Sequence, residues 1–199
     1  MEISIIDYGV GNLFSIAKGI VRAGAKARIV SEPEQLLDAE CIVFPGVGAF
    51  GAAMDVLRPV AGDLRDWILK GTPTLGICLG MQIMFEKSEE SEGSGLSLFA
   101  GDVTKLAARR VPQMGWNEVA SRGDPLFDGI PSPAQFYFAN SYVCRPKEAV
   151  AIATTDYEGP FASAVRKGNL CGVQFHPEKS GPAGLRLLGN FVRMAEERE

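Results

Sequence analysis

The sequence predicts an α/β fold: one three-layer domain with a mostly parallel central sheet flanked by helices, and additional antiparallel strands in the second half. Apolar runs of strand length alternate with helix-period segments up to residue 87, which is typical of a parallel sheet covered on both faces. Beyond residue 96, short strand-like runs follow one another between turn residues. The chain has 199 residues, enough for one full core, and its 46% hydrophobic content indicates a globular protein.

In the first half, strands and helices are predicted to alternate. Residues 13–23 place Leu13, Ile16, Ile20 and Val21 near helical spacing, and Gly24 ends the helix. Residues 41–44 form a continuous apolar run, as in a strand buried on both faces. In chain order we predict strands at 2–6, 27–30, 41–44 and 74–77, and helices at 13–23, 33–37, 49–57, 59–70 and 79–87.

The second half is predicted to be an antiparallel or mixed region. Residues 88–96 are polar, acidic and glycine-rich, which predicts a surface loop. Strands are predicted at 103–107, 117–120, 135–139, 142–145, 149–154, 162–166 and 170–175. An amphipathic helix at 182–197 closes the chain, with Leu185, Leu188, Phe191 and Val192 on one face. No repeat or linker divides the sequence, so we expect one domain over residues 1–199.

Composition excludes several classes of function. The net charge of −4 argues against nucleic acid or an anionic membrane as partner. The four cysteines form no C-x-x-C pair, and a single histidine cannot complete an ordinary zinc set. We therefore expect no metal, no cofactor and reduced thiols in the cytoplasm. The N-terminus lacks the pattern of a signal peptide, and no apolar run approaches the length of a membrane span.

Cys78 is the first candidate catalytic residue. It stands between an apolar strand and a predicted helix, with Gly76 and Gly80 two residues to either side. This G-x-C-x-G pattern is the cysteine version of a nucleophile elbow, a tight turn that needs small neighbours. The field at the helix N-terminus favours a thiolate there. The alternative is a buried core cysteine between two glycines.

His176 is the single histidine, and Glu178 follows it by two residues. Pro177 between them keeps His176 extended, and residues i and i+2 of an extended segment project to the same side. The carboxylate can then orient the imidazole, which acts as the base for Cys78 in a triad for acyl transfer. A surface turn is the alternative interpretation, and the sequence does not show whether Cys78 and His176 meet.

The loop at 46–51 reads Gly-Val-Gly-Ala-Phe-Gly and has two interpretations. It matches the dinucleotide motif G-x-G-x-x-G, with Asp66 at a suitable distance. However, it follows the third strand, and Asp66 lies in a helical pattern. The interpretation that we favour is an oxyanion loop, in which Val47 or Gly48 and Leu79 donate N–H groups to a tetrahedral intermediate. A simple chain-reversing turn is also possible.

Three motifs in this order make the chain resemble class I glutamine amidotransferases. They are PGVG at 45–48, GICLGMQ at 76–82 and FHPE at 175–178. Three further segments resemble the glutaminase subunits of imidazole glycerol phosphate synthases, which serve histidine biosynthesis: IDYGVGN at 6–12, QMGWN at 113–117 and SAVR at 163–166. The resemblance runs nearly end to end and implies a type 1 amidotransferase domain over residues 1–199.

The resemblance implies a role for each matching residue. Cys78 attacks the glutamine side-chain amide, His176 moves the protons, and Glu178 orients His176. Glutamine contacts are implied for Gln82, Glu90, Ser141 and Tyr142. The alternative is a solvated helix face for Gln82, an ordinary acidic loop for Glu90, a strand-end cap for Ser141 and a core aromatic for Tyr142.

The resemblance also implies a partner. Ammonia is expected to pass to a cyclase subunit with a (β/α)₈ barrel, which makes imidazole glycerol phosphate. Three residues match positions expected near that heterodimer interface: Asn12, Trp116 and Lys179. The alternative is a helix cap for Asn12, a packed aromatic for Trp116 and a solvated side chain for Lys179.

The chain departs from the resembled family at three places where members often carry histidine, which here hold Ala49, Gln113 and Asn140. Any polar contact that those histidines would make to the substrate or the partner is therefore in doubt. Three other functions stay open: a glutaminase for a different synthase, a nucleotide-binding module at the 46–51 loop, and a non-catalytic scaffold.

Overall fold

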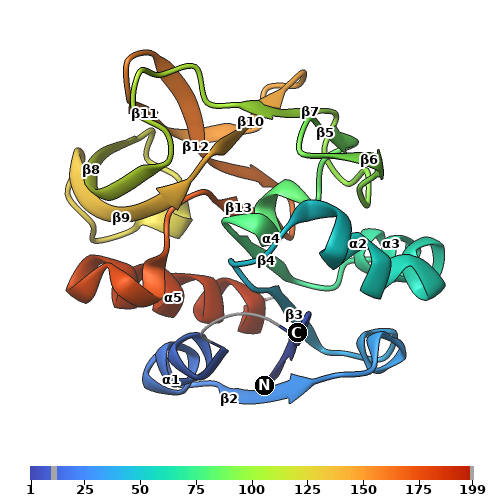
Figure 1. The fold of residues 1–199 in the computed structure, drawn as a ribbon. Helices are drawn as coiled ribbons and strands as arrows, with labels where there is room; N and C mark the ends of the chain where they lie inside the picture. The colour runs from blue at the N-terminus through green and yellow to red at the C-terminus, as the bar shows by residue number, and fades with distance from the viewer. Residues whose placement is uncertain (10–12, 198–199) are drawn as a thin grey trace.

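A nine-stranded mixed sheet forms the centre of the protein (Figure 1). The computed structural model describes residues 1–9 and 13–197. The strand order is β2-β1-β3-β4-β13-β12-β11-β8-β9. Neighbours pair in parallel from β2 to β13 and antiparallel from β13 to β9. The bounds are β1 Glu2–Ile6, β2 Lys26–Val30, β3 Cys41–Phe44, β4 Thr74–Ile77, β8 Gln113–Ser121, β9 Ala134–Asn140, β11 Ala151–Asp156, β12 Pro160–Lys167 and β13 Leu170–Val173.

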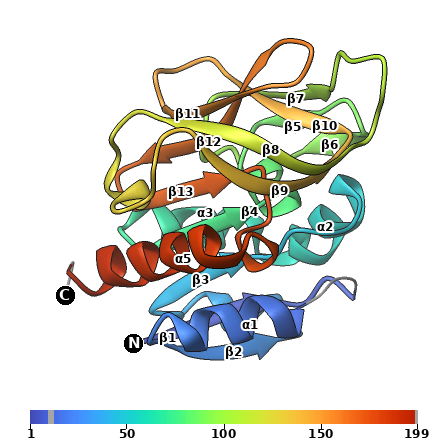
Figure 2. The same ribbon diagram turned by 90° about the vertical axis from the view of Figure 1, so that its left-hand side faces the viewer.

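Helices cover both faces of the parallel part of the sheet, which completes the three predicted layers (Figures 1 and 2). On one face lie α1 (Leu13–Arg22) and α5 (Gly181–Glu196), and on the other α2 (Phe50–Leu57) and α3 (Ala61–Leu69). The side chains of a strand alternate between these faces. Ile5 of β1 joins the core under α1 and α5, whereas Ile6 joins the core under α2 and α3. The predicted α/β class is confirmed.

Short 3₁₀ helices complete the connections at η1 (Pro33–Leu36), η2 (Arg58–Val60), η3 (Pro125–Phe127) and η4 (Pro177–Lys179). One predicted helix face needs correction. The buried side of α5 contains Leu187, Leu188, Phe191 and Val192, whereas Leu185 is 38% exposed. The reason is that Leu185 lies at a groove between α1 and α5, where the two helices do not close over it.

A second sheet of four strands lies beside the main one, in the order β10-β7-β5-β6. Its strands are β5 (Lys87–Ser88), β6 (Ser91–Ser94), β7 (Gly101–Lys105) and β10 (Tyr142–Pro146). The predicted surface loop at 88–96 is therefore wrong in part, since most of it is a hairpin. Its polar residues carry a weak strand signal, and the pairing of Lys87 with Asp102 and Ser88 with Val103 comes from a distant segment.

The predicted helix at 79–87 is much shorter, because α4 spans only Leu79–Gln82. The backbone carbonyls after it are taken by another part of the chain. Leu96 donates its N–H to the Ile83 carbonyl at 2.7 Å, and Leu98 donates to the Met84 carbonyl at 2.8 Å. In a helix that continued to residue 87, the Ile83 carbonyl would instead accept the N–H of Lys87. The segment that follows α4 is therefore held against the turn before β7.

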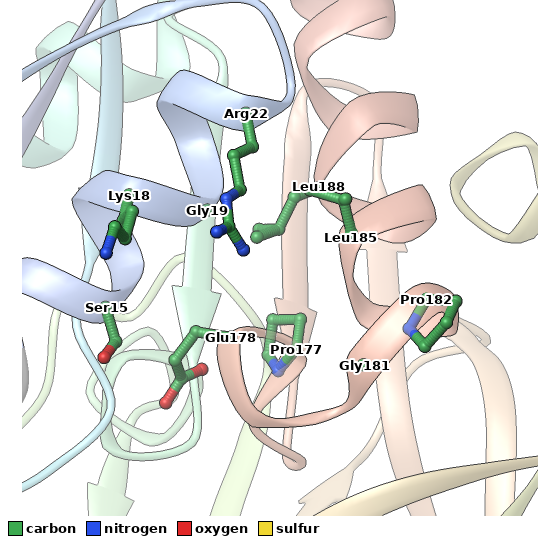
Figure 3. Close-up of a pocket in the computed structure, with 10 residues that line it drawn as sticks. All are labelled: Ser15, Lys18, Gly19, Arg22, Pro177, Glu178, Gly181, Pro182, Leu185 and Leu188. Atoms are coloured by element: carbon green, nitrogen blue, oxygen red, sulfur yellow. The ribbon is translucent and has the colours of Figure 1, made fainter.

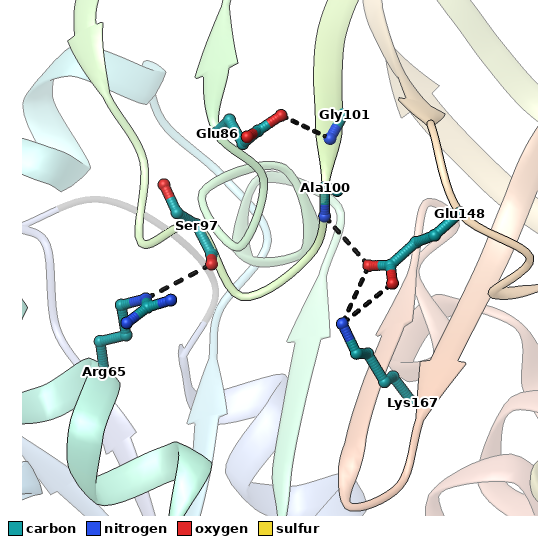
Figure 4. A network of polar contacts seen from close by, with 7 residues as sticks. All are labelled: Arg65, Glu86, Ser97, Ala100, Gly101, Glu148 and Lys167. Carbon is teal, nitrogen blue, oxygen red and sulfur yellow. Dashed lines mark hydrogen bonds and ion pairs between the residues drawn. The ribbon is translucent and has the colours of Figure 1, made fainter.

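A polar network ties the small sheet to the rest of the molecule (Figure 4). Lys167 of β12 pairs with Glu148 at 2.9 Å, and Glu148 also accepts the Ala100 N–H at 3.0 Å. Glu86 accepts the Gly101 N–H at 2.8 Å, and Arg65 of α3 donates to the Ser97 carbonyl. The turn that enters β7 is thereby fixed to both sides. The small sheet places Tyr142 at the edge of the candidate site described next.

Candidate active site

Cys78 occupies a strained turn between β4 and α4. Its φ of 50° and ψ of −103° lie in a region that residues other than glycine rarely adopt. A Cβ on Gly80 would lie 2.0 Å from the Phe44 carbonyl oxygen, and one on Gly76 would lie 2.5 Å from the Gly80 oxygen. Both glycines are therefore required by close backbone approach, and the predicted elbow geometry is confirmed.

His176 lies next to the cysteine. It follows the end of β13, and its N–H donates to the Tyr137 carbonyl at 2.8 Å. Its Nδ1 lies 2.9 Å from Glu178 Oε1, and the two side chains are 1% and 3% exposed. Its ring is also within hydrogen-bonding reach of the Cys78 side chain. Cys78, His176 and Glu178 thus form a contiguous row.

The predicted route to the His176–Glu178 contact is wrong. We expected both residues on one side of an extended segment. Only His176 is extended, with φ −102° and ψ 95°, and Glu178 lies in η4. The Ser180 hydroxyl donates to the His176 carbonyl at 2.6 Å and closes the turn, within which Glu178 lies in hydrogen-bonding reach of His176 Nδ1.

The environment of His176 favours the protonated imidazole. Burial lowers its pKa, but hydrogen bonds and charge interactions with Cys78 and Glu178 outweigh burial and raise the pKa to about 10. The ring is therefore an imidazolium near neutral pH, next to the sulfur that it serves. The other carboxylate oxygen, Glu178 Oε2, is buried and has no hydrogen-bond partner among the described residues.

The sulfur opens onto a pocket of about 220 Å³, which we call the cysteine pocket. This volume is below the roughly 300–1,000 Å³ of sites for drug-sized ligands and suits a small metabolite. The pocket brings together all the predicted oxyanion and substrate residues, which come from four separate segments. Its lining is Gly46, Val47, Gly48, Cys78, Leu79, Gln82, Glu90, Ala139, Asn140, Ser141 and Tyr142.

The sequence model of the family described as Glutamine amidotransferase class-I matches residues 4–195. The chain belongs to the class I glutamine amidotransferase family. Imidazole glycerol phosphate synthase subunit HisH of Thermococcus kodakarensis is 49% identical to it, covering 96% of this chain and 100% of the relative. The HisH subunit of Pyrococcus furiosus is 47% identical, covering 97% and 99%.

Solved structures show the same fold. A glutamine amidotransferase structure aligns with a TM-score of 0.76 at 19% identity and covers 98% of each chain. PurLQS from Thermotoga maritima also aligns at 0.76, with 17% identity over 96% of this chain and 97% of that one. At such low identity these two matches show the fold alone.

Three pocket residues of this amidotransferase have structural features that bear on their roles. Glu90 Oε2 accepts the N–H of Phe50, the first residue of α2, at 2.7 Å, so Glu90 also caps that helix. Leu79 is the first residue of α4, where the N–H has no partner within the helix. Gly48 has a φ of 125°, a conformation that favours glycine.

The dinucleotide interpretation of the 46–51 loop loses support from its surroundings. Asp66 lies within α3, away from any strand end. A Cβ on Gly46 would lie 3.0 Å from His176 Cε1, so the loop backs directly onto the imidazole.

Sequence reasoning missed one residue of the site, Gln174. Its side chain is fully buried, and its Nε2 lies 3.4 Å from Cys78 Sγ. The signal was present: Gln174 is a polar residue within the apolar run that we predicted as a strand over 170–175. Because buried polar groups are nearly always hydrogen-bonded, such a residue indicates a specific partner.

Two of the positions that depart from the resembled pattern are buried near the pocket. Gln113 of β8 and Asn140 of β9 are directly opposite in register. Asn140 Nδ2 donates to the Tyr142 carbonyl at 3.1 Å, while Asn140 Oδ1 and both polar atoms of the Gln113 side chain have no partner among the described residues. Ala49, the third position, is the exposed cap residue of α2.

The predicted interface residues fall partly on one surface. Trp116 is 58% exposed, and its ring meets the Tyr137 ring edge-on at 6.2 Å. Lys179 Nζ lies 5.6 Å from the centre of the same Tyr137 ring. Trp116, Tyr137 and Lys179 thus form one cluster, which we call the Tyr137 cluster. Asn12 lies outside the described residues.

A larger hollow of about 490 Å³, which we call the helix groove, lies between α1 and α5 (Figure 3). Glu178 lines it together with Lys18 and Arg22, but Cys78 does not. Among the described residues, no cluster of His, Cys, Asp and Glu could hold a metal ion. Within the same described ranges, no helix has the length and apolarity to cross a membrane.

Proposed function

We propose that this amidotransferase is the glutaminase subunit of an imidazole glycerol phosphate synthase and hydrolyses L-glutamine to glutamate and ammonia in histidine biosynthesis. One observation carries the proposal: a strained cysteine lines a small pocket and interacts with a buried His–Glu pair. The near full-length similarity to HisH subunits supports the choice of synthase. We also propose that residues 1–199 form one domain and that the protein works in the cytoplasm without metal or cofactor.

In the proposed acylation, the Cys78 thiolate attacks the carbon of the substrate side-chain amide. The carbonyl oxygen becomes an oxyanion, which the N–H of Leu79 and an N–H of the Val47–Gly48 loop stabilise. His176 donates its proton to the leaving nitrogen, so ammonia departs and a glutamyl thioester remains.

In the proposed deacylation, the now neutral His176 takes a proton from water. The resulting nucleophile attacks the thioester, and the C–S bond breaks with its electron pair returning to sulfur. Glutamate is released, and Cys78 and His176 recover their starting states. Glu178 holds the ring orientation throughout. Gln82, Glu90, Ser141 and Tyr142 are proposed to position the substrate, because they line the same pocket as Cys78.

We further propose that the ammonia passes to a (β/α)₈-barrel cyclase subunit bound over the Tyr137 cluster. Trp116 offers exposed aromatic area there, which is typical of residues that anchor protein interfaces. Asn12 stays a prediction for this interface. A rise of glutaminase activity on cyclase binding is expected, together with a loss of that rise in Trp116→Ala.

The test is glutamate production with and without the cyclase and its nucleotide ligand. Wild-type protein should turn over glutamine, and Cys78→Ala should lower the rate by on the order of 10⁶-fold, as for loss of a triad nucleophile. A glutamine-analogue electrophile should label Cys78 and spare Cys41 and Cys144, because burial raises the pKa of both of those thiols. Cys41→Ala is the matched control and should keep activity. Unchanged turnover in Cys78→Ala would contradict the proposal.

A further inference from the structure

Gln174 contacts the catalytic sulfur although it is not a member of the triad. It lies just after β13, two residues before His176, and its N–H donates to the Ser163 carbonyl at 2.9 Å. The side chain is fully buried, and its Nε2 lies 3.4 Å from Cys78 Sγ. Cys78 therefore interacts with two nitrogen-bearing groups, the imidazole of His176 and the amide of Gln174.

The direction of the Gln174 amide follows from its neighbours. The Tyr142 carbonyl can only accept, and Gln82 Nε2 donates to it at 3.1 Å. The same Nε2 has a second hydrogen and lies 3.3 Å from Gln174 Oε1. The carbonyl end of Gln174 is thus engaged by Gln82, which leaves its NH₂ end toward the sulfur.

We propose that Gln174 is a second hydrogen-bond donor to the catalytic sulfur, which holds Sγ in place and stabilises the thiolate, and that Gln82 fixes its orientation. This inference rests on the proposed function, since it takes Cys78 as the nucleophile. A hydrogen bond to the charged form of a group favours that form, and bonds to charged groups are the stronger ones.

The role matters whenever the sulfur carries negative charge, which is before acylation and again at the end of deacylation. His176 takes a proton from water before the C–S bond breaks, so the imidazolium and the Gln174 amide both face the sulfur as the electron pair returns to it. The Gln174 N–H is already directed at that atom, because its orientation comes from the Tyr142 carbonyl and does not depend on the triad.

The first experiment measures how the alkylation of Cys78 by iodoacetamide depends on pH, with mass mapping of the adduct. Gln174→Leu removes the donor and should move the midpoint of the alkylation profile upward by about one to two pH units, from a hydrogen bond to a charged group of roughly 1.5–3 kcal/mol. Gln113→Leu is the matched control, since Gln113 is also a buried glutamine but does not line the cysteine pocket. Its profile should equal that of the wild type.

Gln174→Glu is the second variant and keeps the shape of the side chain. It places an oxygen where the donor was, so its midpoint should lie at least as high as that of Gln174→Leu. Gln82→Leu leaves the donor but removes its anchor, and a smaller upward shift is expected. The alkylation of Cys78 is measured without glutamine, so a contact between Gln82 and the substrate cannot affect the result.

The outcomes separate this inference from the proposed function. If glutamine turnover does not depend on Cys78 in the wild type, the proposed function fails first. If turnover depends on Cys78 but the folded Gln174→Leu and Gln174→Glu proteins keep the wild-type alkylation midpoint, Gln174 has only a packing role and this inference is overturned. Should Gln174→Leu not fold, the Gln174→Glu profile alone decides in the same way.

Discussion

The cysteine pocket is lined by Cys78 and the helix groove by Glu178, so each hollow contains one member of the triad, and the smaller one contains the nucleophile. The cysteine pocket has about 220 Å³ and holds the sulfur, a helix N-terminus and a glycine loop. The helix groove has about 490 Å³, and its lining includes Glu178 with the cations Lys18 and Arg22. Convergence of polar groups on one reacting atom, and not volume, identifies the site.

The cysteine pocket and the helix groove differ because they lie at different places in the topology of the fold. The cysteine pocket lies where the carboxyl ends of β3 and β4 meet loops from the antiparallel half and the small sheet. Ligand sites of open α/β sheets occur at such strand ends. The helix groove is a gap between two helices, where Leu185 and Leu188 do not fill the space. The contrast can be tested by changing matched residues on the two sides.

The largest effect is expected for Glu178→Gln, because Glu178 lines the helix groove and its carboxylate also contacts His176. The variant keeps the side-chain shape but removes the charge that orients and stabilises the imidazolium. Turnover of glutamine should fall by roughly 10²–10⁴-fold, by analogy with loss of the orienting acid in a serine triad. Steady-state glutamate production measures this, with a thermal melt to show that the variant is folded. Activity within threefold of wild type would mean that Glu178 serves the helix groove alone.

A pair of glycine substitutions compares the two hollows directly. Gly48 of the cysteine pocket has φ 125°, and Gly181 of the helix groove has φ 57°. Gly48→Ala should displace the oxyanion loop and lower turnover by about 10- to 10³-fold. Gly181→Ala should cost about 1–2 kcal/mol of folding free energy and change turnover less than twofold. Equal losses of activity in both variants would show that the cysteine pocket is no more important for turnover than the helix groove.

The titration of His176 sharpens the comparison further. It is the only histidine, so every imidazole signal in a proton NMR titration belongs to it. The folded pKa of about 10 lies above the ordinary 6.5. Its contribution to the free energy of unfolding is therefore fully present below pH 6.5 and is lost as the pH rises through about 10.

We expect the ring to stay protonated through neutral pH, with a midpoint near 10. In Glu178→Gln the midpoint should move downward, and the loss of stability at high pH should become shallower. Denaturant unfolding of both proteins across this pH range provides the second measurement. If the midpoint of the imidazole titration in the wild type were near 6.5, Glu178 and Cys78 would not stabilise the protonated ring as proposed.

The smallest effect is expected for Lys18→Ala in the helix groove. Lys18 lines the groove but not the cysteine pocket. Basal glutamine turnover should change less than twofold, and the free energy of unfolding should stay within about 0.5 kcal/mol, as for surface substitutions. Assays of the free subunit are the appropriate measurement. A tenfold loss of basal turnover would give the groove a direct part in the chemistry.

Local physics made much of the molecule predictable from its residues. The elbow at Cys78 follows from glycine spacing, because only small residues allow the backbone approach seen at Gly80. The first-half strands follow from continuous apolar runs such as 41–44, which are buried on both faces. The contact of His176 with Glu178 was also anticipated, although the 3₁₀ turn that produces it was not.

Tertiary structure alone decided the features that depend on distant partners. The helix after Cys78 does not continue to residue 87, because the Glu86 N–H donates to the Gly101 carbonyl and the Ile83 carbonyl accepts from Leu96. The hairpin at 87–94 exists because β7 pairs with it. Likewise, a glutamine has no intrinsic direction: Gln174 presents its NH₂ to the sulfur because the Tyr142 carbonyl and Gln82 lie on its other side. The backbone conformation of a short segment depends on the residues next to one another in the sequence, so it can be predicted. The hydrogen-bond partners of a residue depend on which distant segments pack against it, so they are known only from the tertiary structure.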